Sequence, residues 1–354
     1  MKNKILTGLL LVLIGGWGSL SAQSAGSNYA RQVNTLIGTK GVGLTSGYLY
    51  PGATYPYGMV QFTPSYFSKR SGFVINQLSG GGCEHMGNFP TFPVKGKLKM
   101  SPDNILNYRI NISEEKGHAG YYEAKVQEDI HAKLTVTERT GMASYEYPAD
   151  QQYGTVIIGG GISATPIEQA AIVITAPNKC EGYAEGGNFC GLRTPYKVYF
   201  VAEFDTDALE SGTWKRNELK PNTTFAEGEY SGVYFTFDVN KKKNIQYKIG
   251  VSYVSVENAR ENLKAENTGW DFLQIQNQAE SKWNHYLGKI EVEGTNPDRT
   301  TQFYTHLYRS FIHPNVCSDV NGEYMGADFR VHKSRSKHYT SFSNWDTYRT
   351  QIQL

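Results

Sequence analysis

The 354-residue sequence predicts a mainly β fold, in which a β-sandwich is followed by a helical segment. Tyrosine and glycine are both abundant, at 25 and 37 residues, and such a composition favours short strands joined by turns. Short stretches of strand-forming residues fill positions 120–255, and apolar spacing turns helical after Ser255. The net charge of +2 is close to neutral, so the sequence gives no sign of nucleic-acid binding.

The first 22 residues have the pattern of a secretory signal peptide. Lys2 and Lys4 precede an apolar run over 5–14, and small residues dominate 15–22. The run is too short to span a bilayer, although an uncleaved anchor is the alternative reading. No cysteine stands at the exit to carry a lipid, and no later segment is apolar enough to cross a membrane. We therefore expect a secreted, periplasmic or surface-facing protein.

The strands expected between 120 and 255 are short and are separated by Gly, Asn, Asp and Pro. In the first of them Leu134 and Val136 alternate with Thr135 and Thr137, which is the period of a half-buried strand. Seven or more such segments are typical of a β-sandwich. The expected strands are 132–138, 144–147, 155–158, 171–175, 196–204, 232–239 and 245–254.

Helices are expected after Ser255, which is placed to cap the first of them. Apolar residues from Phe272 to Leu287 follow a helical period and predict an amphipathic linker helix docked by Trp283. A short strand is expected at 290–293, and another helix from Arg299 to Phe311. The predicted organisation is a signal peptide (1–22), a sandwich domain (27–265), a linker helix and connector (266–297), and the start of a helical domain (298–354).

Four cysteines follow the signal peptide. Cys180 and Cys190 lie ten residues apart in a glycine-rich stretch, so we expect a disulfide that pins a loop there, with two free thiols as the alternative. Cys83 and Cys317 have no evident partner in the sequence. Cys83 and His85 offer two potential metal ligands within three residues, which is too few to predict a zinc site.

The glycine-rich segment from Gly38 to Gly43 resembles a phosphate-binding loop only superficially. No Gly-Lys-Ser/Thr ending follows it, and no βαβ unit surrounds it. Nucleotide binding is therefore not expected.

Several segments, taken in their order and spacing, resemble the exo-acting α-mannosidases of glycoside hydrolase family 92. The resemblance covers nearly all of the mature chain but only the amino-terminal half of a typical member. The segments are Val-Asn-Thr-Leu-Ile-Gly-Thr at 33–39, Pro-Gly-Ala-Thr-Tyr-Pro-Tyr-Gly-Met-Val at 51–60, 78–83 with 87–90, 119–122 with 132–137, 303–308, His-Pro-Asn at 313–315, and Trp-Asp-Thr-Tyr-Arg at 345–349.

The resemblance implies a galactose-mutarotase-like (supersandwich) N-terminal domain and a C-terminal (α/α)6 barrel, with the active site between them. It also implies calcium dependence and inversion at the anomeric carbon. An inverting glycosidase uses one carboxylic acid to protonate the leaving oxygen and one carboxylate to activate water. Calcium is a hard cation that sugar hydroxyls can coordinate, and its ligands are expected mostly beyond this chain. The family's two catalytic carboxylates lie beyond Leu354, so no catalytic residue is assigned here.

Trp345, Asp346 and Arg349 match the family's sugar-binding segment. The resemblance implies that the Trp345 ring packs on the sugar, that Asp346 accepts hydrogen bonds from its hydroxyls, and that Arg349 orients Asp346 or seals the helix. A buried helix start with a satisfied aspartate is the alternative reading. An exposed apolar patch is also expected, because Phe303, Leu307, Phe311 and Trp345 should pack on barrel helices that the chain does not contain.

The sandwich contributes a loop to the family's site, matched here by residues 79–88 with Cys83, Glu84 and His85 at its tip. Glu84 and His85 are expected to contact the leaving sugar, and the alternative is a solvated glycine-rich loop. Members specific for α-1,2 linkages carry a His-Leu-Ser-Gly-Thr-Gly pattern, whereas this chain has Asn-Gln-Leu-Ser-Gly-Gly-Gly-Cys at 76–83. The difference leaves the linkage specificity open.

The sequence thus predicts a glycoside hydrolase that removes terminal mannose from glycans. Residues 1–354 alone are expected to lack hydrolytic activity, because the catalytic acid and base lie beyond them. The alternative is a non-catalytic, carbohydrate-binding β-sandwich module that binds mannose-containing glycans.

Overall fold

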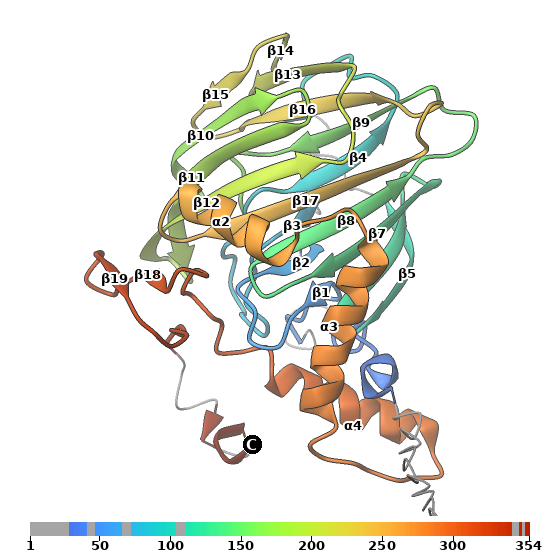
Figure 1. Cartoon of the computed structure of the whole chain (residues 1–354), viewed down its shortest axis with the longest axis vertical. Helices are drawn as coiled ribbons and strands as arrows, with labels where there is room; N and C mark the ends of the chain where they lie inside the picture. The colour runs from blue at the N-terminus through green and yellow to red at the C-terminus, as the bar shows by residue number, and fades with distance from the viewer. Residues whose placement is uncertain (1–27, 41–46, 66–71, 104–110, 342–346, 349–350) are drawn as a thin grey trace, which may run out of the picture.

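The computed structural model describes residues 28–40, 47–65, 72–103, 111–341, 347–348 and 351–354 (Figure 1). Two large antiparallel sheets form a sandwich, one helix lies against the second sheet, and two more lie at one end of the sandwich. The predicted signal peptide at 1–22 and part of the segment 38–43 lie outside the described residues. No helix in the described ranges is long and apolar enough to span a membrane.

The first sheet has eight strands, and the second has nine. In spatial order the first contains β1 (Ala53–Thr54), β2 (Gln61–Pro64), β3 (Phe73–Val74), β4 (Thr91–Lys95), β9 (Tyr153–Ile158), β16 (Ser231–Asp238), β13 (Glu210–Lys215) and β14 (Glu218–Pro221). The second contains β15 (Phe225–Glu227), β10 (Ile167–Ala176), β11 (Lys179–Phe189), β12 (Leu192–Phe204), β17 (Asn244–Ser252), β8 (Thr140–Glu146), β7 (Ile130–Val136), β6 (Tyr121–Val126) and β5 (Ile112–His118).

The core between the sheets is rich in aromatic rings. Phe204 from β12 lies 5.0 Å from Phe235 of the opposite sheet and 5.3 Å from Tyr247 of its own sheet, centroid to centroid. All three side chains are fully buried. The β-sandwich predicted from the strand pattern is therefore confirmed, and each of the seven expected strands overlaps an observed one.

Ten of the seventeen described strands in the two sheets were not predicted from the sequence, and β11 is the longest of these. Residues of β11 alternate between half-buried and buried positions, and the buried face begins with Cys180, Gly182 and Ala184. These small side chains let β11 pack closely in the sheet, because a Cβ at Gly182 would lie 2.1 Å from the carbonyl oxygen of Ala171. The glycine content that suggested a loop therefore belongs to the interior of a strand.

The predicted disulfide between Cys180 and Cys190 is wrong, because the observed disulfide joins Cys83 to Cys190. Cys180 is the second residue of β11 and Cys190 follows its end, so at about 3.3 Å per residue they lie on the order of 30 Å apart. The Cα atoms of Cys83 and Cys190 are 5.3 Å apart, within the range that a disulfide requires. Cys180 is a buried free thiol, and burial raises its pKa, which makes it unreactive.

Three α-helices follow the sandwich: α2 (Val256–Glu266), α3 (Phe272–Leu287) and α4 (Pro297–Ser310). Short 3₁₀ turns, η1 (Tyr29–Gln32) and η3 (Gln351–Gln353), lie near the two ends of the described chain. The Ser255 side chain accepts a hydrogen bond from the Asn258 amide at 3.0 Å, so the predicted N-cap is confirmed. The strand expected at 290–293 is wrong, because these residues form an irregular link between α3 and α4.

A second hydrophobic core joins these helices to the sandwich. The fully buried Trp283 of α3 donates a hydrogen bond from Nε1 to the Thr54 carbonyl at 2.6 Å and packs 4.5 Å from Tyr308 of α4. Leu307 and Phe311 are buried in the same core. The expectation that these two residues await barrel helices is therefore wrong, since this chain itself covers them.

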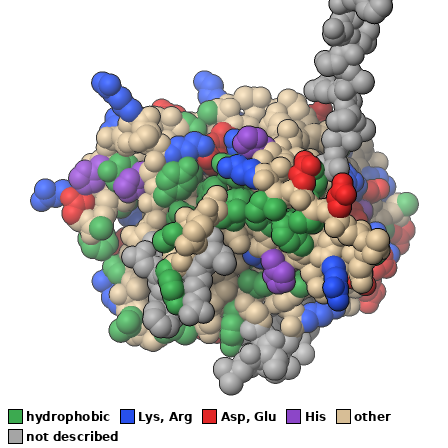
Figure 2. Space-filling model, turned by 90° about the horizontal axis from the view of Figure 1, so that it is seen from below, with side chains coloured by type: hydrophobic (Ala, Val, Ile, Leu, Met, Phe, Trp, Pro, Cys, Tyr) green, Lys and Arg blue, Asp and Glu red, His purple; other side chains and the backbone are tan. Residues whose placement is uncertain are grey.

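A partly apolar groove runs along the other side of α4. Seen from below, hydrophobic side chains gather across the middle of the face (Figure 2). The groove has a volume of about 880 Å³ and is lined by Ile290, Phe303, His306, Leu307, Ser310, Tyr348, Gln351, Gln353 and Leu354. Phe303 is only partly buried, so the expected exposed patch is present in reduced form.

Replacing Cys190 by Ser should lower the free energy of unfolding by about 2–5 kcal/mol, because the Cys83–Cys190 disulfide constrains a long loop in the unfolded chain. Chemical denaturation measures the change. Cys180→Ala is the matched control, and it should retain the cross-linked peptide in a non-reducing digest. Recovery of a peptide that links residues 180 and 190 would contradict the observed pairing.

Replacing Trp283 by Phe should destabilise the protein by about 2–4 kcal/mol. The change removes the donor to the Thr54 carbonyl and leaves a small cavity beside Tyr308. Trp270→Phe is the control, since Trp270 is only partly buried and should change stability by less than about 1 kcal/mol. Equal losses in the two variants would show that the indole does not dock α3.

Candidate functional site

The sandwich and the helical segment meet where the loop 79–88 contacts the turn after α4. The chain leaves α4 through a cis peptide bond between His313 and Pro314. The Ser79 amide of the sandwich loop donates a hydrogen bond to Nε2 of His313 at 3.0 Å. The Gly80 amide donates to the Tyr48 carbonyl at 2.9 Å, which fixes the loop from its other side. This junction is the candidate site.

His85 lies inside the sandwich loop and holds its shape. Its side chain is almost fully buried, and Nε2 accepts a hydrogen bond from the Leu78 amide at 2.8 Å. Nδ1 lies 2.6 Å from the Cys83 carbonyl and donates to it, which fixes the neutral tautomer. Burial lowers the pKa of His85, in agreement with a neutral ring. Its ring also packs edge-on against Phe189, 5.8 Å away.

His313 is the second neutral histidine of the junction. Its Nδ1 donates to Oδ1 of Asn315 at 2.7 Å, and the Asn315 amide nitrogen donates to the Gly58 carbonyl at 2.7 Å. The pKa of His313 is lowered to about 4, chiefly by burial and also by the nearby His85, while the hydrogen bond to Asn315 opposes the change. A neutral ring can accept from the Ser79 amide, whereas a protonated ring cannot. The sequence showed the His-Pro-Asn segment but not this contact.

The sequence-predicted site residues fall into two groups. Cys83, Glu84 and His85 lie together at the loop tip, where Cys83 is disulfide-bonded, Glu84 is exposed and His85 is buried. Contacts of Glu84 and His85 with a leaving sugar stay a prediction. Trp345, Asp346 and Arg349 lie outside the described residues, so their predicted roles are also carried forward as predictions.

A cluster of tyrosines beside the junction was missed by the sequence analysis. Tyr57 packs edge-on against Tyr286, Phe311 and Tyr339, with centroid distances of 5.6, 6.0 and 6.3 Å. Burial raises the pKa of Tyr57, and of nearby Tyr55, to about 12. The rings come from the sandwich, α3 and the segment after α4, which are far apart in the sequence. The high tyrosine content was therefore the only feature of the sequence that pointed to the cluster.

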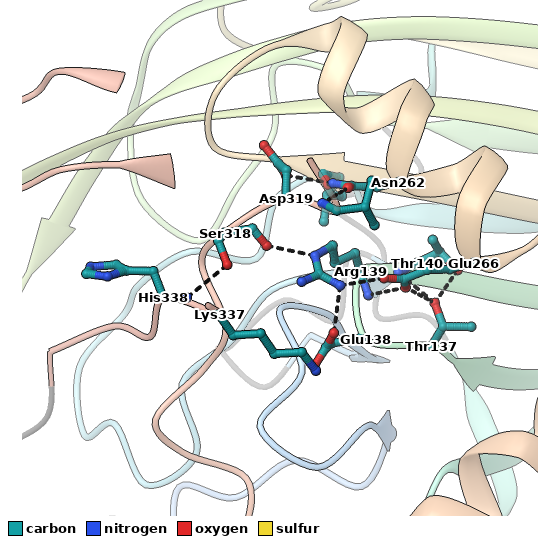
Figure 3. Close-up of polar contacts among 12 residues, drawn as sticks. Thr137, Glu138, Arg139, Thr140, Asn262, Glu266, Ser318, Asp319, Lys337 and His338 are labelled. Atoms are coloured by element: carbon teal, nitrogen blue, oxygen red, sulfur yellow. Dashed lines mark hydrogen bonds and ion pairs between the residues drawn. The ribbon is translucent and has the colours of Figure 1, made fainter. Parts of the chain in front are cut away.

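A buried ion-pair network ties the segment after α4 to the sandwich (Figure 3). Arg139, in the turn between β7 and β8, bonds Glu138 and Glu266 through Nη1, each at 2.6 Å, and donates from Nε to the Ser318 carbonyl at 2.7 Å. Lys337 pairs with Glu138 at 2.5 Å. Burial lowers the pKa of Arg139, but the two carboxylates outweigh this effect and raise it overall. The guanidinium therefore stays charged.

A second polar network lies next to the first and involves Asp319 (Figure 3). The buried Asp319 carboxylate accepts hydrogen bonds from Ser252, Asn258 and Asn262 at 2.6, 2.9 and 2.6 Å. Burial raises its pKa, and the three donors oppose that change. The two networks together hold residues 316–340 against β17 and α2.

The described residues do not contain three His, Cys, Asp or Glu side chains grouped so that they could hold a metal ion. Asp319 is the most buried carboxylate near the junction, and its oxygens already accept protein hydrogen bonds. A calcium ion needs six to eight oxygen ligands, which this set does not offer. We therefore assign no calcium ligand within the described part of the chain.

Two family models match the chain in succession. The glycosyl hydrolase family 92 N-terminal domain matches residues 32–252, and the family 92 catalytic domain matches residues 258–354. A curated relative from Arthroderma benhamiae, described as an uncharacterized secreted glycosidase, is 26% identical over 363 residues. That match covers 91% of this chain and 45% of the relative.

The fold is shared with solved structures of the same family. A family GH92 α-mannosidase from Bacteroides thetaiotaomicron superposes with a TM-score of 0.80 at 25% identity, covering 92% of this chain and 47% of that one. A GH92 inverting mannosidase from the same organism superposes with a TM-score of 0.78 at 24% identity, covering 92% of this chain and 45% of that one. This second similarity is evidence for a shared fold only. The chain spans less than half the length of each of these relatives.

The two-sheet sandwich with helices packed against it is a fold that this chain shares with a glycoside hydrolase, the family GH92 α-mannosidase. The family 92 N-terminal model alone matches more than half of the sequence. The chain belongs to glycosyl hydrolase family 92. The resemblance found in the sequence is thereby confirmed.

Stability should fall as the pH decreases from about 6.5 to about 4, because His313 takes up a proton more readily in the unfolded chain than in the folded one. Above that window both states hold a neutral ring, and below it both are protonated. The shift from 6.5 to about 4 corresponds to a loss of about 3 kcal/mol.

Denaturation at pH 7 and at pH 4.5 measures this loss in the wild type and in His313→Gln. The variant cannot titrate, so its stability should vary less over this window. His306→Gln is the control, because His306 is exposed on α4. A pH dependence equal in all three proteins would show that His313 does not carry it.

Proposed function

We propose that the chain forms the sandwich and the start of the catalytic domain of an exo-acting α-mannosidase that cleaves terminal mannose with inversion. The main support for this proposal is the order of the two family 92 matches. The N-terminal-domain match ends at residue 252, and the catalytic-domain match begins at residue 258. Superposition on a GH92 α-mannosidase over 92% of this chain supports mannose as the substrate. A solved structure of that enzyme holds mannoimidazole.

The proposed site lies at the junction of the sandwich and the helical segment. The hydrogen bond from Ser79 to His313 joins the two domains there, and the Cys83–Cys190 disulfide anchors the loop tip. Glu84 is exposed at that tip and is proposed to contact the leaving sugar. Because both His85 nitrogens are engaged within the loop, we propose that His85 acts by holding the loop in shape.

Trp345, Asp346 and Arg349 are proposed to bind the terminal mannose. The networks of Arg139 and Asp319 support this role, because they anchor residues 316–340, which lead directly to the Trp-Asp segment. A tryptophan ring packs on the apolar face of a sugar, and a carboxylate accepts hydrogen bonds from its hydroxyls. The general acid and base are assigned to no residue of this chain.

Calcium is the proposed cofactor, on the strength of family membership. When bound, it would coordinate sugar hydroxyls and help distort the ring. Export is also proposed, because the curated relative is described as secreted and the Cys83–Cys190 disulfide requires an oxidising compartment. The protein would then act on mannose-containing glycans outside the cytoplasm.

Replacing Asp346 by Asn in the whole gene product should lower kcat/KM on 4-nitrophenyl α-mannoside about 10–100-fold, because the charged acceptor of the sugar hydroxyls becomes neutral and one of its two oxygens becomes a donor. Asp150→Asn is the matched control, since Asp150 is exposed on the far turn between β8 and β9. Proton NMR of the first-released sugar should show β-mannose, the product of inversion.

Release of α-mannose would contradict inversion. Tight mannose binding by the whole gene product without hydrolysis of any α-mannoside would favour the alternative, a carbohydrate-binding module. The same assay on residues 1–354 tests the expectation, drawn from the resemblance, that this part alone does not hydrolyse mannosides.

A further inference from the structure

The hairpin of β11 and β12 extends past the strands on either side of it. In the described residues, β10 pairs with β11 only as far as Gly186, and β17 pairs with β12 only from Tyr199 onward. Beyond these residues the hairpin is a two-stranded ribbon, closed by a turn at Cys190 and Gly191. A two-stranded ribbon is only marginally stable by itself, so its place in the structure depends on what it contacts.

The end of this ribbon contacts the tip of the loop 79–88. Cys190 forms the disulfide with Cys83, and the neighbouring Phe189 packs its ring edge-on against His85, 5.8 Å away. His85 in turn bonds to the loop backbone through both ring nitrogens. The ribbon therefore holds the loop by a covalent bond and through the histidine that gives the loop its shape.

A third contact joins the ribbon to the base of the loop. The Tyr196 hydroxyl of β12 donates a hydrogen bond to Oδ1 of Asn88 at 2.6 Å. Asn88 is fully buried, and its Oδ1 also accepts from the side-chain amide of Asn76 at 3.0 Å, while its backbone amide donates to Oδ1 of Asn76 at 2.8 Å. These hydrogen bonds close the two ends of the loop on each other and on β12.

Cys190 occupies a position that cysteine rarely takes. Its φ is +52° and that of Gly191 is +84°, so both central residues of the turn are left-handed. Such a two-residue turn favours Asn-Gly or Asp-Gly, because other side chains strain the backbone there. A cysteine at this point costs free energy, and its effect is to bond the extreme tip of the hairpin to Cys83.

The loop has little stiffness of its own. Gly80, Gly81 and Gly82 are consecutive, and glycine has the widest backbone freedom of all residues. Glu84 follows Cys83 directly, so the disulfide lies one residue from the carboxylate that is proposed to contact the leaving sugar. The place of that carboxylate is consequently set by the ribbon more than by the loop itself.

We propose that the ribbon determines which leaving groups the enzyme accepts, because it positions Glu84 beside the leaving sugar. This inference rests on the proposed function and deepens it: the favoured substrates would be mannosides whose leaving group is itself a sugar. Cys190, Phe189 and Tyr196 are positioning residues, which act through the loop and do not touch the substrate.

Steady-state kinetics of the whole gene product on two kinds of substrate test the proposal. One is 4-nitrophenyl α-mannoside, whose leaving group is not a sugar, and the other is the α-1,2-, α-1,3- or α-1,6-linked mannobiose that the wild type cleaves best. The measured quantity is the ratio of kcat/KM for the mannobiose to kcat/KM for the aryl mannoside. In Cys190→Ser this ratio should fall about tenfold, because the group that binds the leaving sugar is misplaced.

A double-mutant cycle shows whether the disulfide acts through Glu84. Glu84→Gln should lower the same ratio. Cys190→Ser combined with Glu84→Gln should lower it no further than the larger of the two single effects, because both changes remove one interaction.

A second variant keeps the test valid if Cys190→Ser does not fold. Tyr196→Phe retains the disulfide and removes only the hydrogen bond to Asn88, so the ratio should fall about threefold. Tyr199→Phe is the matched control, because Tyr199 lies on the opposite face of β12 and packs 6.0 Å from Tyr183.

Ile245→Ala is the control for stability alone. Ile245 is fully buried in the half of β17 that lies away from the ribbon, so this variant should lose stability without a change in the ratio.

The proposal is overturned if Cys190→Ser and Tyr196→Phe reduce activity equally on both substrates, since a disulfide that only stabilises the fold would do that. Additive effects of Cys190→Ser and Glu84→Gln would overturn it as well. If the wild type cleaves neither substrate, the proposed function fails and this inference fails with it. If the wild type cleaves both and no variant changes the ratio, only this inference fails.

Discussion

The docking of α3 on the sandwich is the interaction on which the rest of this structure depends. Trp283 lies fully buried between the Thr54 carbonyl and the ring of Tyr308, so one side chain contacts both the sandwich and α4. Gly120 permits the approach, since a Cβ there would lie 2.9 Å from the Cβ of Ala279. Because α4 packs on the same ring, the position of α3 fixes the turn at His313 and hence the junction.

The junction is held by groups that must stay in one protonation state. His85 and His313 are neutral and accept hydrogen bonds from backbone amides, whereas Arg139 is charged and forms ion pairs with two carboxylates. Burial excludes water from all three, so each hydrogen bond is strengthened and each alternative state is costly. The loop and the segment after α4 are thereby preorganised relative to each other, which a binding site between two domains requires.

The fold class and seven of the seventeen described strands of the two sheets could be predicted from the sequence, because alternating apolar residues mark half-buried strands, as in Leu134 and Val136. The strand β11 was not predicted for a physical reason. Gly182 and Ala184 face a crowded interior that requires small side chains, and small residues are also typical of loops. The pairing of Cys83 with Cys190 could not be predicted, because it depends on a tertiary contact between segments 107 residues apart. The family motifs identified the loop 79–88 and the His-Pro-Asn turn. Their hydrogen bonds, the tyrosine cluster and the Arg139 network join distant segments and could not be predicted.

Under the proposed export, the cysteines would emerge from the translocation channel in the order of the sequence. Cys83 would emerge first and would have to remain unpaired until Cys190 appears, while Cys180 would appear ten residues before Cys190. Once β11 has joined the sheet, the Cys180 thiol is sealed in the interior and cannot compete for Cys190. If this strand folds before the thiols react, only the correct pair of cysteines is left to be oxidised, whereas a disulfide between Cys180 and Cys190 would keep β11 from completing the second sheet.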